Sequence, residues 1–259
     1  MRQLAGAVPG LIRHLPHHKP WMVALSLIAV AVVTATCGMG SYLLVRDEST
    51  VVGAAATPTP TIPKRDITSR ANDPTPLTAA DVFPDTEITA DPSIPPYKRI
   101  GKAQVSKDCR LAATSDLGKL LSSLGCNQVV RATFLSPDGT YYVTGGIFNL
   151  RDEAAGTKAE AKIKDLVDAG KGRFTGYIAN AATRILGRAP TQLSWDAQGH
   201  FLIYSVIARK DGKELAADDA HLRVMVYDIV EKYLRDTVIE RWSIDHSSAD
   251  PSAAASPSG

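Results

Sequence analysis

Hydrophobic residues follow two different patterns along the chain. Residues 21–45 form one long, mainly apolar run, whereas between residues 97 and 245 short apolar stretches alternate with turns and helical stripes. Polar or proline-rich sequence separates and follows these regions. The pattern predicts an anchored domain in five parts: a short basic tail (1–20), a transmembrane helix (21–45), a linker (46–96), a domain of mixed α and β structure (97–245) and a disordered tail (246–259).

The apolar run 21–45 contains no charged residue. A helix rises about 1.5 Å per residue, so this run can span the ~30 Å hydrocarbon core of a lipid bilayer once. The basic residues Arg2, Arg13 and Lys19 precede this run. The acidic residues Asp47 and Glu48 follow it. Because positive charge stays in the cytoplasm, we expect a single-pass protein of the cell membrane with a cytoplasmic N-terminus and an extracellular domain.

Three other interpretations concern this N-terminal region. Small residues at 54–56 could end a cleaved secretory signal, but the apolar part of a signal usually has only ~7 to 15 residues. Cys37 could be lipidated, but Thr36 stands where such a site needs a smaller residue. The histidines His14, His17 and His18 could hold a metal, although a solvated patch at the membrane surface explains them better. We therefore favour a retained anchor without a metal site.

The linker 46–96 carries nine of the sixteen prolines of the chain. Proline removes a backbone donor and favours extended structure, so we expect a stalk that holds the domain away from the membrane. Threonines beside the prolines could accept O-linked sugars. A linker without any selected role is an equally good interpretation of the segment.

The domain contains two hairpins, each followed by a helix. Strands at 128–135 and 140–148 precede a helix at 152–169, and strands at 192–196 and 200–209 precede a helix at 219–241. The two halves align weakly, which suggests tandem ββα units. An antiparallel sheet with helices on the face that carries Val130, Phe134 and Trp195 gives a two-layer α+β sandwich. The second strand of each hairpin is apolar on both faces, so the connector or a partner could cover part of the far face.

Cys109 and Cys126 are the only cysteines outside the apolar run. They flank a predicted short helix that begins near Thr114 or Ser115 and ends at Gly125. An extracellular setting favours a disulfide between them, and closing a loop of this length stabilises a domain by ~3 kcal/mol. A redox-active pair is the less favoured interpretation, because the CxxC spacing is missing.

Recognised catalytic patterns are missing from the sequence after the apolar run: it has no GxSxG, HExxH, GxxxxGK[ST] or calcium-loop pattern. His200, His221 and His246 are interpreted as surface residues. The acidic pairs at 152–153 and 218–219 begin predicted helices, where carboxylates interact favourably with the positive end of the helix dipole. We therefore predict no enzyme activity and no cofactor. Basic and acidic residues are interspersed, so we expect no nucleic-acid partner.

The second hairpin strands offer a candidate ligand or partner surface. Gly145 and Gly146 interrupt one strand and could mark a bulge or let a ligand approach the backbone, and the structural interpretation is favoured. If the sheet has an open face, Tyr142 and Tyr204 would provide stacking surfaces on it for a sugar or a protein.

The run CRLAATSDLGKLLSSLGCNQVVRATFLSPDGTYYVTGGIFNL, together with the proline-rich segment before it, resembles single-pass membrane proteins of actinomycetes, which are high-GC Gram-positive bacteria. The resemblance implies a cell-surface setting but no activity and no functional residues. We expect a cell-envelope protein whose exported domain is a non-enzymatic protein-interaction or sensing module. The alternative is a module that binds a cell-wall polymer or a small ligand, and an unrecognised envelope hydrolase is less favoured.

Overall fold

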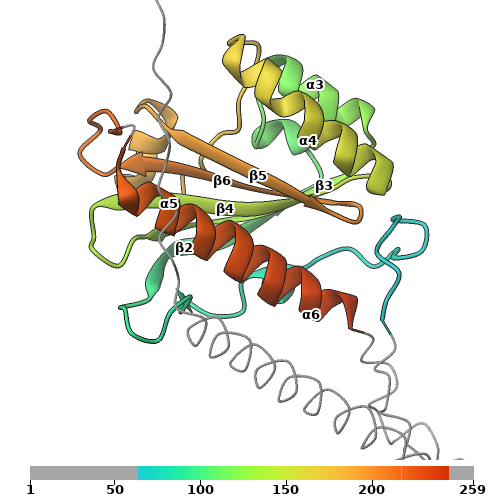
Figure 1. Ribbon diagram of the computed structural model, residues 1–259, viewed down its shortest axis with the longest axis horizontal. Coiled ribbons are helices and arrows are strands. Elements are labelled where there is room, and N and C mark those ends of the chain that lie inside the picture. Colours follow the sequence, from blue (N-terminus) through green and yellow to red (C-terminus); the bar gives the residue numbers. More distant parts are fainter. Residues whose placement is uncertain (1–63, 217, 245–259) are drawn as a thin grey trace, which may run out of the picture. The chain divides into compact units, whose positions relative to one another are not determined.

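A six-stranded antiparallel sheet lies at the centre of the computed structural model, which describes residues 64–216 and 218–244 (Figure 1). The strand order is β1-β2-β3-β4-β6-β5. The strands are β1 (Glu87–Ile88), β2 (Tyr97–Ser106), β3 (Gln128–Leu135), β4 (Tyr141–Asn149), β5 (Gln192–Gln198) and β6 (Phe201–Arg209). The sheet confirms the α+β class and both predicted hairpins.

Helices and helical turns occupy the connections between the strands. They are α2 (Ala79–Val82), η1 (Cys109–Leu111), α3 (Ser115–Ser123), α4 (Glu153–Asp168), η2 (Ala182–Gly187), α5 (Ala220–Val226), η3 (Tyr227–Ile239) and α6 (Glu240–Ser243). The last three follow one another without a gap, and η3 is π-helical. Within the described ranges, no helix is both long and apolar enough to span a bilayer. The predicted transmembrane helix at 21–45 and the tail at 246–259 lie outside these ranges.

The two hairpins join through their second strands. β4 pairs with β6 from Tyr141↔Arg209 to Asn149↔Phe201, so the two hairpins form one continuous sheet in which β4 and β6 are interior strands. The hairpin turns contain Gly139 and Gly199, both with positive φ, a conformation that glycine adopts without steric cost. In each turn glycine therefore fixes the register in which the two strands return.

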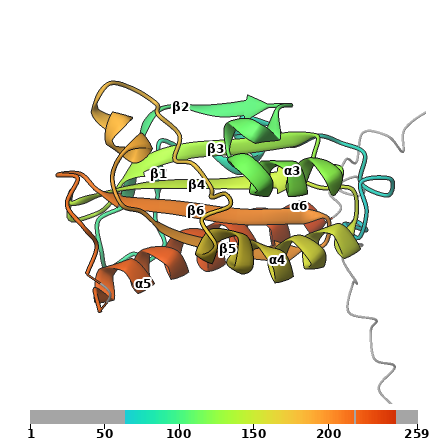
Figure 2. The same ribbon diagram turned by 90° about the horizontal axis from the view of Figure 1, so that it is seen from above.

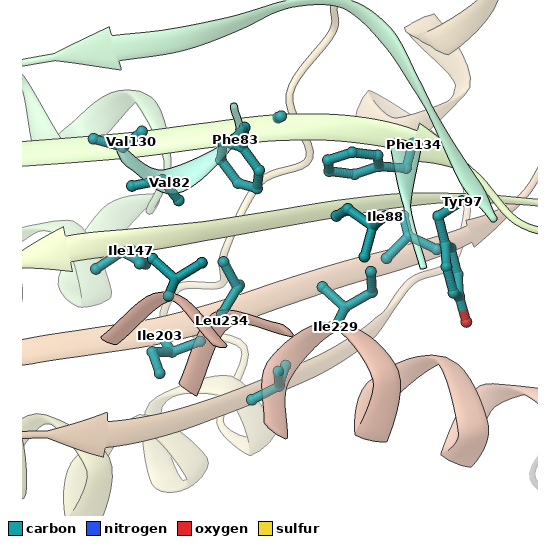
Figure 3. Packing of buried hydrophobic residues seen from close by; sticks show 14 of the residues in the cluster. Val82, Phe83, Ile88, Tyr97, Val130, Phe134, Ile147, Ile203, Ile229 and Leu234 are labelled. Atoms are coloured by element: carbon teal, nitrogen blue, oxygen red, sulfur yellow. The ribbon is translucent and has the colours of Figure 1, made fainter. Parts of the chain in front are cut away.

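Helices cover both faces of the sheet, which therefore has three layers instead of the expected two. Val130, Ile147 and Ile203 pack beneath the α5–η3 helix, on the face shown in Figure 3. Val129, Phe148 and Leu202 face α3 and α4, which lie on the opposite side of the sheet in Figure 1. Figure 2 shows α4 crossing over β5 and β6 with α3 beside it. The apolar second strands need this cover on both sides, because strand residues point alternately to the two faces.

Trp195 lies on the opposite face from Val130 and Phe134, which corrects the face expected from the sequence. It pairs with Tyr204, and both side chains pack toward α3 and α4. Val130 and Phe134 pack toward the C-terminal helix. A shift of one residue in register moves a strand's side chains to the other face.

The helices that follow the two hairpins also lie on opposite faces. Three residues separate β4 from α4, whereas ten separate β6 from α5, which packs on the other side of the sheet. Each of the two suggested ββα units therefore has its own hairpin, but their helices cover opposite faces of the sheet.

Part of the expected linker is folded against the domain. From Lys64 onward, this segment supplies α2 and the edge strand β1, and Lys64 forms a β-bridge with Ile244. Val82, Phe83 and Ile88 are buried in the same cluster as Phe134, where Figure 3 shows them packed together. These few apolar side chains stabilise the segment despite its prolines, because their burial offsets the cost of ordering it.

Candidate functional site

The four residues that the sequence suggested as a ligand or partner surface are all buried. Tyr204 is 0% exposed and stacks with Phe174 at a ring distance of 4.9 Å. Tyr142 packs in a small cluster with Leu186 and Ala208 beneath η2. The faces of the sheet that would have exposed these tyrosines are covered, so they do not provide an open stacking surface.

Gly145 and Gly146 are explained by close packing. A Cβ atom on Gly145 would lie 2.8 Å from Cγ2 of Ile229, on the C-terminal helix. A Cβ atom on Gly146 would lie 2.6 Å from Cε1 of Tyr204 and 2.8 Å from the backbone oxygen of Val130. The two glycines let a helix approach one face of β4 and an aromatic ring approach the other.

Cys109 and Cys126 form a disulfide, as predicted. It joins η1 to the residues just before β3, so both ends of α3 are tied to the sheet. Cys109 is buried against Leu117 and Leu121 of that helix. The disulfide therefore stabilises the packing of α3 on this face of the sheet.

His200 is completely buried, although the sequence suggested a surface residue. Its Nδ1 lies 3.0 Å from Oδ1 of Asn149, and its Nε2 lies 3.2 Å from Oδ2 of Asp73. Asp73 also accepts hydrogen bonds from Nε1 of Trp242 at 2.6 Å and from Arg65 at 3.1 Å. No local sequence pattern indicates this network, because Asp73 and Trp242 are far from His200 along the chain.

This network links the segment before α2, which contains Arg65 and Asp73, and the helix α6 to the turn between β5 and β6. Burial alone would raise the pKa of Asp73, but hydrogen bonds from His200 and Trp242 and the charge of Arg65 bring it below its ordinary value. Both ring nitrogens of His200 are engaged with protein atoms. A histidine held in this way, without contact with solvent, serves structure.

The acidic pairs at the helix starts have the structural role that the sequence suggested. Asp152 accepts a hydrogen bond from the backbone of Ala155 and caps α4. Asp219 accepts one from the backbone of His221 and caps α5. A carboxylate at these positions accepts hydrogen bonds from free N–H groups of the first turn and interacts favourably with the helix dipole.

An open hollow of about 390 Å³ lies beside the start of α5. Three segments line it: residues 94–97, the β3–β4 turn with Tyr141, and α5 with His221, Val224 and Met225. We call it the α5 hollow. Its floor consists of apolar and aromatic side chains, and its volume is in the range of natural ligand sites. We take it as the candidate site, because its lining is more apolar than that of the other hollows in the described part of the chain, some of which are larger.

The two tyrosines of the α5 hollow are held by carboxylates behind them. The hydroxyl of Tyr97 donates to Oδ2 of Asp228 at 2.6 Å, and the hydroxyl of Tyr141 donates to Asp219. Burial and the neighbouring Asp228 raise the pKa of Tyr97, so its hydroxyl stays protonated. With their polar ends occupied, the rings offer mainly apolar surface to the hollow.

The apolar surface continues outside the hollow along the helix. Val224 is 50% exposed, and Tyr227, three residues later and on the same side of the helix, is 45% exposed. No local sequence pattern points to the whole of this site, because its lining comes from residues near 95, 138 and 224. One feature of the sequence does point to part of it: Val224 and Tyr227 are large apolar residues that lie outside the buried face of the final helix.

The α5 hollow contains Ser136, Asp138 and His221, which are residue types of hydrolytic sites. Their arrangement does not form such a site, because the hydroxyl of Ser136 donates to Asp138 at 2.5 Å and the imidazole Nδ1 of His221 lies 3.2 Å from Asp219. No hydrogen bond joins Ser136 to His221 there, so the serine lacks a base. In residues 64–216 and 218–244, no three histidine, cysteine or acidic residues are grouped to hold a metal ion.

Comparisons with known proteins give no further guide: no family model matches the chain, and neither a curated protein nor a solved structure similar to it was found. The fold and the site therefore define the class only as a disulfide-linked α+β domain with an open apolar hollow.

Proposed function

We propose that the chain is a membrane-anchored protein of the cell envelope whose exported domain is a non-enzymatic protein-interaction or sensing module. Its recognition site is the α5 hollow. The apolar run at 21–45 and the charges around it support the anchor and the orientation. The disulfide is consistent with an oxidising, extracellular setting.

The observation that carries the proposal is the apolar floor of the hollow beside the exposed side chains of Val224 and Tyr227. Exposed apolar surface next to a concave site is typical of surfaces that bind partners. A buried anchor in such a pocket usually dominates the free energy of binding. The engaged hydroxyls of Tyr97 and Tyr141 favour binding through apolar contact over chemistry at these groups.

The test is in-cell chemical crosslinking of the full-length chain followed by purification and mass spectrometry. The variant Val224→Glu places a charge at the mouth of the hollow, and Val105→Glu is the matched control, because Val105 is 46% exposed on β2. We expect partners that the wild type and the control retain and that Val224→Glu loses.

Equal partners in all three proteins would contradict a protein-interaction role for the hollow. Retention of the chain on purified cell-wall material would then favour the alternative, a module that binds a wall polymer. The crosslinking and the wall-binding assay use the same three proteins, so one set of variants separates the two functions.

A further inference from the structure

We propose that the partner presents an apolar side chain next to a positively charged one, in a short segment that seats in the α5 hollow. This inference rests on the proposed function and adds the chemistry of the partner. It follows from the charges around an otherwise apolar site.

The carboxylates near the hollow outnumber its cations. Asp138 lines it, and Asp219 and Asp228 each accept a hydrogen bond from a lining tyrosine. Asp91 lies close enough to Asp228 to raise the pKa of that carboxyl, after the larger effect of burial. Acidic groups therefore surround the hollow from the segment before β2, from the β3–β4 turn and from the C-terminal helix.

Two of these carboxyls are ionised at neutral pH. Hydrogen bonds from Ser136 and Thr140 outweigh the effect of partial burial and hold the pKa of Asp138 below its ordinary value. The hydrogen bond from Tyr141 does the same for the pKa of Asp219. Both groups therefore present negative charge at the site.

Among the described residues, no lysine or arginine forms an ion pair with Asp138 or Asp219, and Lys232, farther along the helix, lies over the ring of Tyr227 at 5.7 Å. Arg209 lies over the ring of Tyr141 at 5.9 Å, but its guanidinium is paired with Asp211 at 2.8 Å. The only basic side chain in the lining is that of His221, which is largely exposed and faces Asp219. A positive charge on the partner would therefore meet complementary potential at the rim.

The extent of the apolar surface favours a segment of a protein as the occupant. The hollow itself accommodates one or two side chains, whereas Tyr227, three residues after the lining residue Val224, extends the apolar surface along the helix beyond it. A peptide can place an apolar anchor in the hollow and cover this strip with its neighbours.

The test uses the full-length chain in nanodiscs of zwitterionic phosphatidylcholine, which does not attract basic peptides electrostatically. A phage-displayed library of random dodecapeptides is selected on it, and a synthetic peptide with the resulting consensus is titrated against variants. Val224→Ser tests the apolar contact and Asp138→Asn tests the charge.

Each variant has a matched control. Val105→Ser removes a similarly exposed valine from β2. Asp66→Asn removes a similar carboxylate, since both Asp66 and Asp138 accept a backbone N–H two residues later and a nearby hydroxyl. A control that weakens binding as much as its test variant would overturn the assignment of the site.

We expect a consensus in which an aromatic or aliphatic residue is adjacent to lysine or arginine. Asp138→Asn should weaken binding of that peptide about two- to five-fold, as expected for loss of one exposed ion pair, and Val224→Ser about five-fold or more. Higher salt should also weaken it, because surface charges are screened.

Two results would overturn the inference in different ways. An apolar consensus that lacks basic residues and is lost in Val224→Ser would leave the proposed site standing and refute its charge preference. Failure to enrich peptides, or enrichment that is unaffected by Val224→Ser, would refute both the charge preference and the hollow as the recognition site.

Discussion

The substitution Gly146→Ala tests whether the glycines of β4 serve packing. The added Cβ atom would lie 2.6 Å from Cε1 of Tyr204, 2.8 Å from the backbone oxygen of Val130 and 2.9 Å from Cβ of Arg131. Two of these neighbours belong to the adjacent strand β3, paired through the middle of the sheet, and the tyrosine ring is fully buried. None of the three can move without disturbing other contacts.

Overpacking of this kind usually costs about 1–3 kcal/mol, and we expect Gly146→Ala to cost about 2 kcal/mol or more because a backbone atom is involved. A loss of about 2 kcal/mol changes the ratio of folded to unfolded protein roughly 30-fold. In urea, with a slope of about 1–3 kcal/mol per molar for small proteins, the midpoint should fall by roughly 1 M.

The assay is urea unfolding of the full-length chain in nanodiscs, followed by tryptophan fluorescence. Gly187→Ala is the control, because the nearest atom to its added Cβ would be Cδ1 of Ile178 at an ordinary contact distance of 3.5 Å. An unfolding midpoint for Gly146→Ala as high as that of the control would refute the packing explanation of this glycine.

Three further predictions concern stability. Replacing Cys109 and Cys126 by serine should lower the free energy of unfolding by about 3 kcal/mol in urea, since the disulfide closes a separation of 17 residues; no change would mean that it does not constrain the unfolded chain. Asp73 has a lowered pKa, so it contributes stability that is fully present above its unfolded pKa of about 3.9 and is lost as pH falls through the folded pKa. Asp73→Asn should therefore flatten the acid limb of a plot of unfolding free energy against pH. An unchanged acid limb would contradict this. Tyr97→Phe should lower the free energy of unfolding by about 1.5–3 kcal/mol, because it leaves the buried carboxyl of Asp228 without its donor; a thermal transition equal to that of the wild type would count against that hydrogen bond.

The elements of the fold could be predicted from local patterns, but their arrangement in layers could not. Alternation of apolar residues identified the hairpins, and Gly139 and Gly199 marked their turns. The face of Trp195 depends on the register between β5 and β6, which pairing across the sheet determines. The folding of residues 64–96 depends on contacts of Val82 and Phe83 with side chains far along the chain.

The candidate site was harder to predict than the fold for the same reason. The sequence directed attention to Tyr142 and Tyr204, whose exposure depended on whether the sheet had an open face. The α5 hollow arises where three distant segments meet, and no local pattern records that meeting. The disulfide was predictable, because only two cysteines lie outside the apolar run.

Site-specific photocrosslinking in cells tests whether the α5 hollow is the surface that binds a partner. A photoreactive amino acid replaces Val224 at the mouth of the α5 hollow in one protein and the similarly exposed Val105 on β2 in another. We expect a discrete crosslinked protein from position 224 that position 105 does not give and that excess consensus peptide displaces. Identical products from both positions, or a product from position 105 alone, would contradict the α5 hollow as the recognition site.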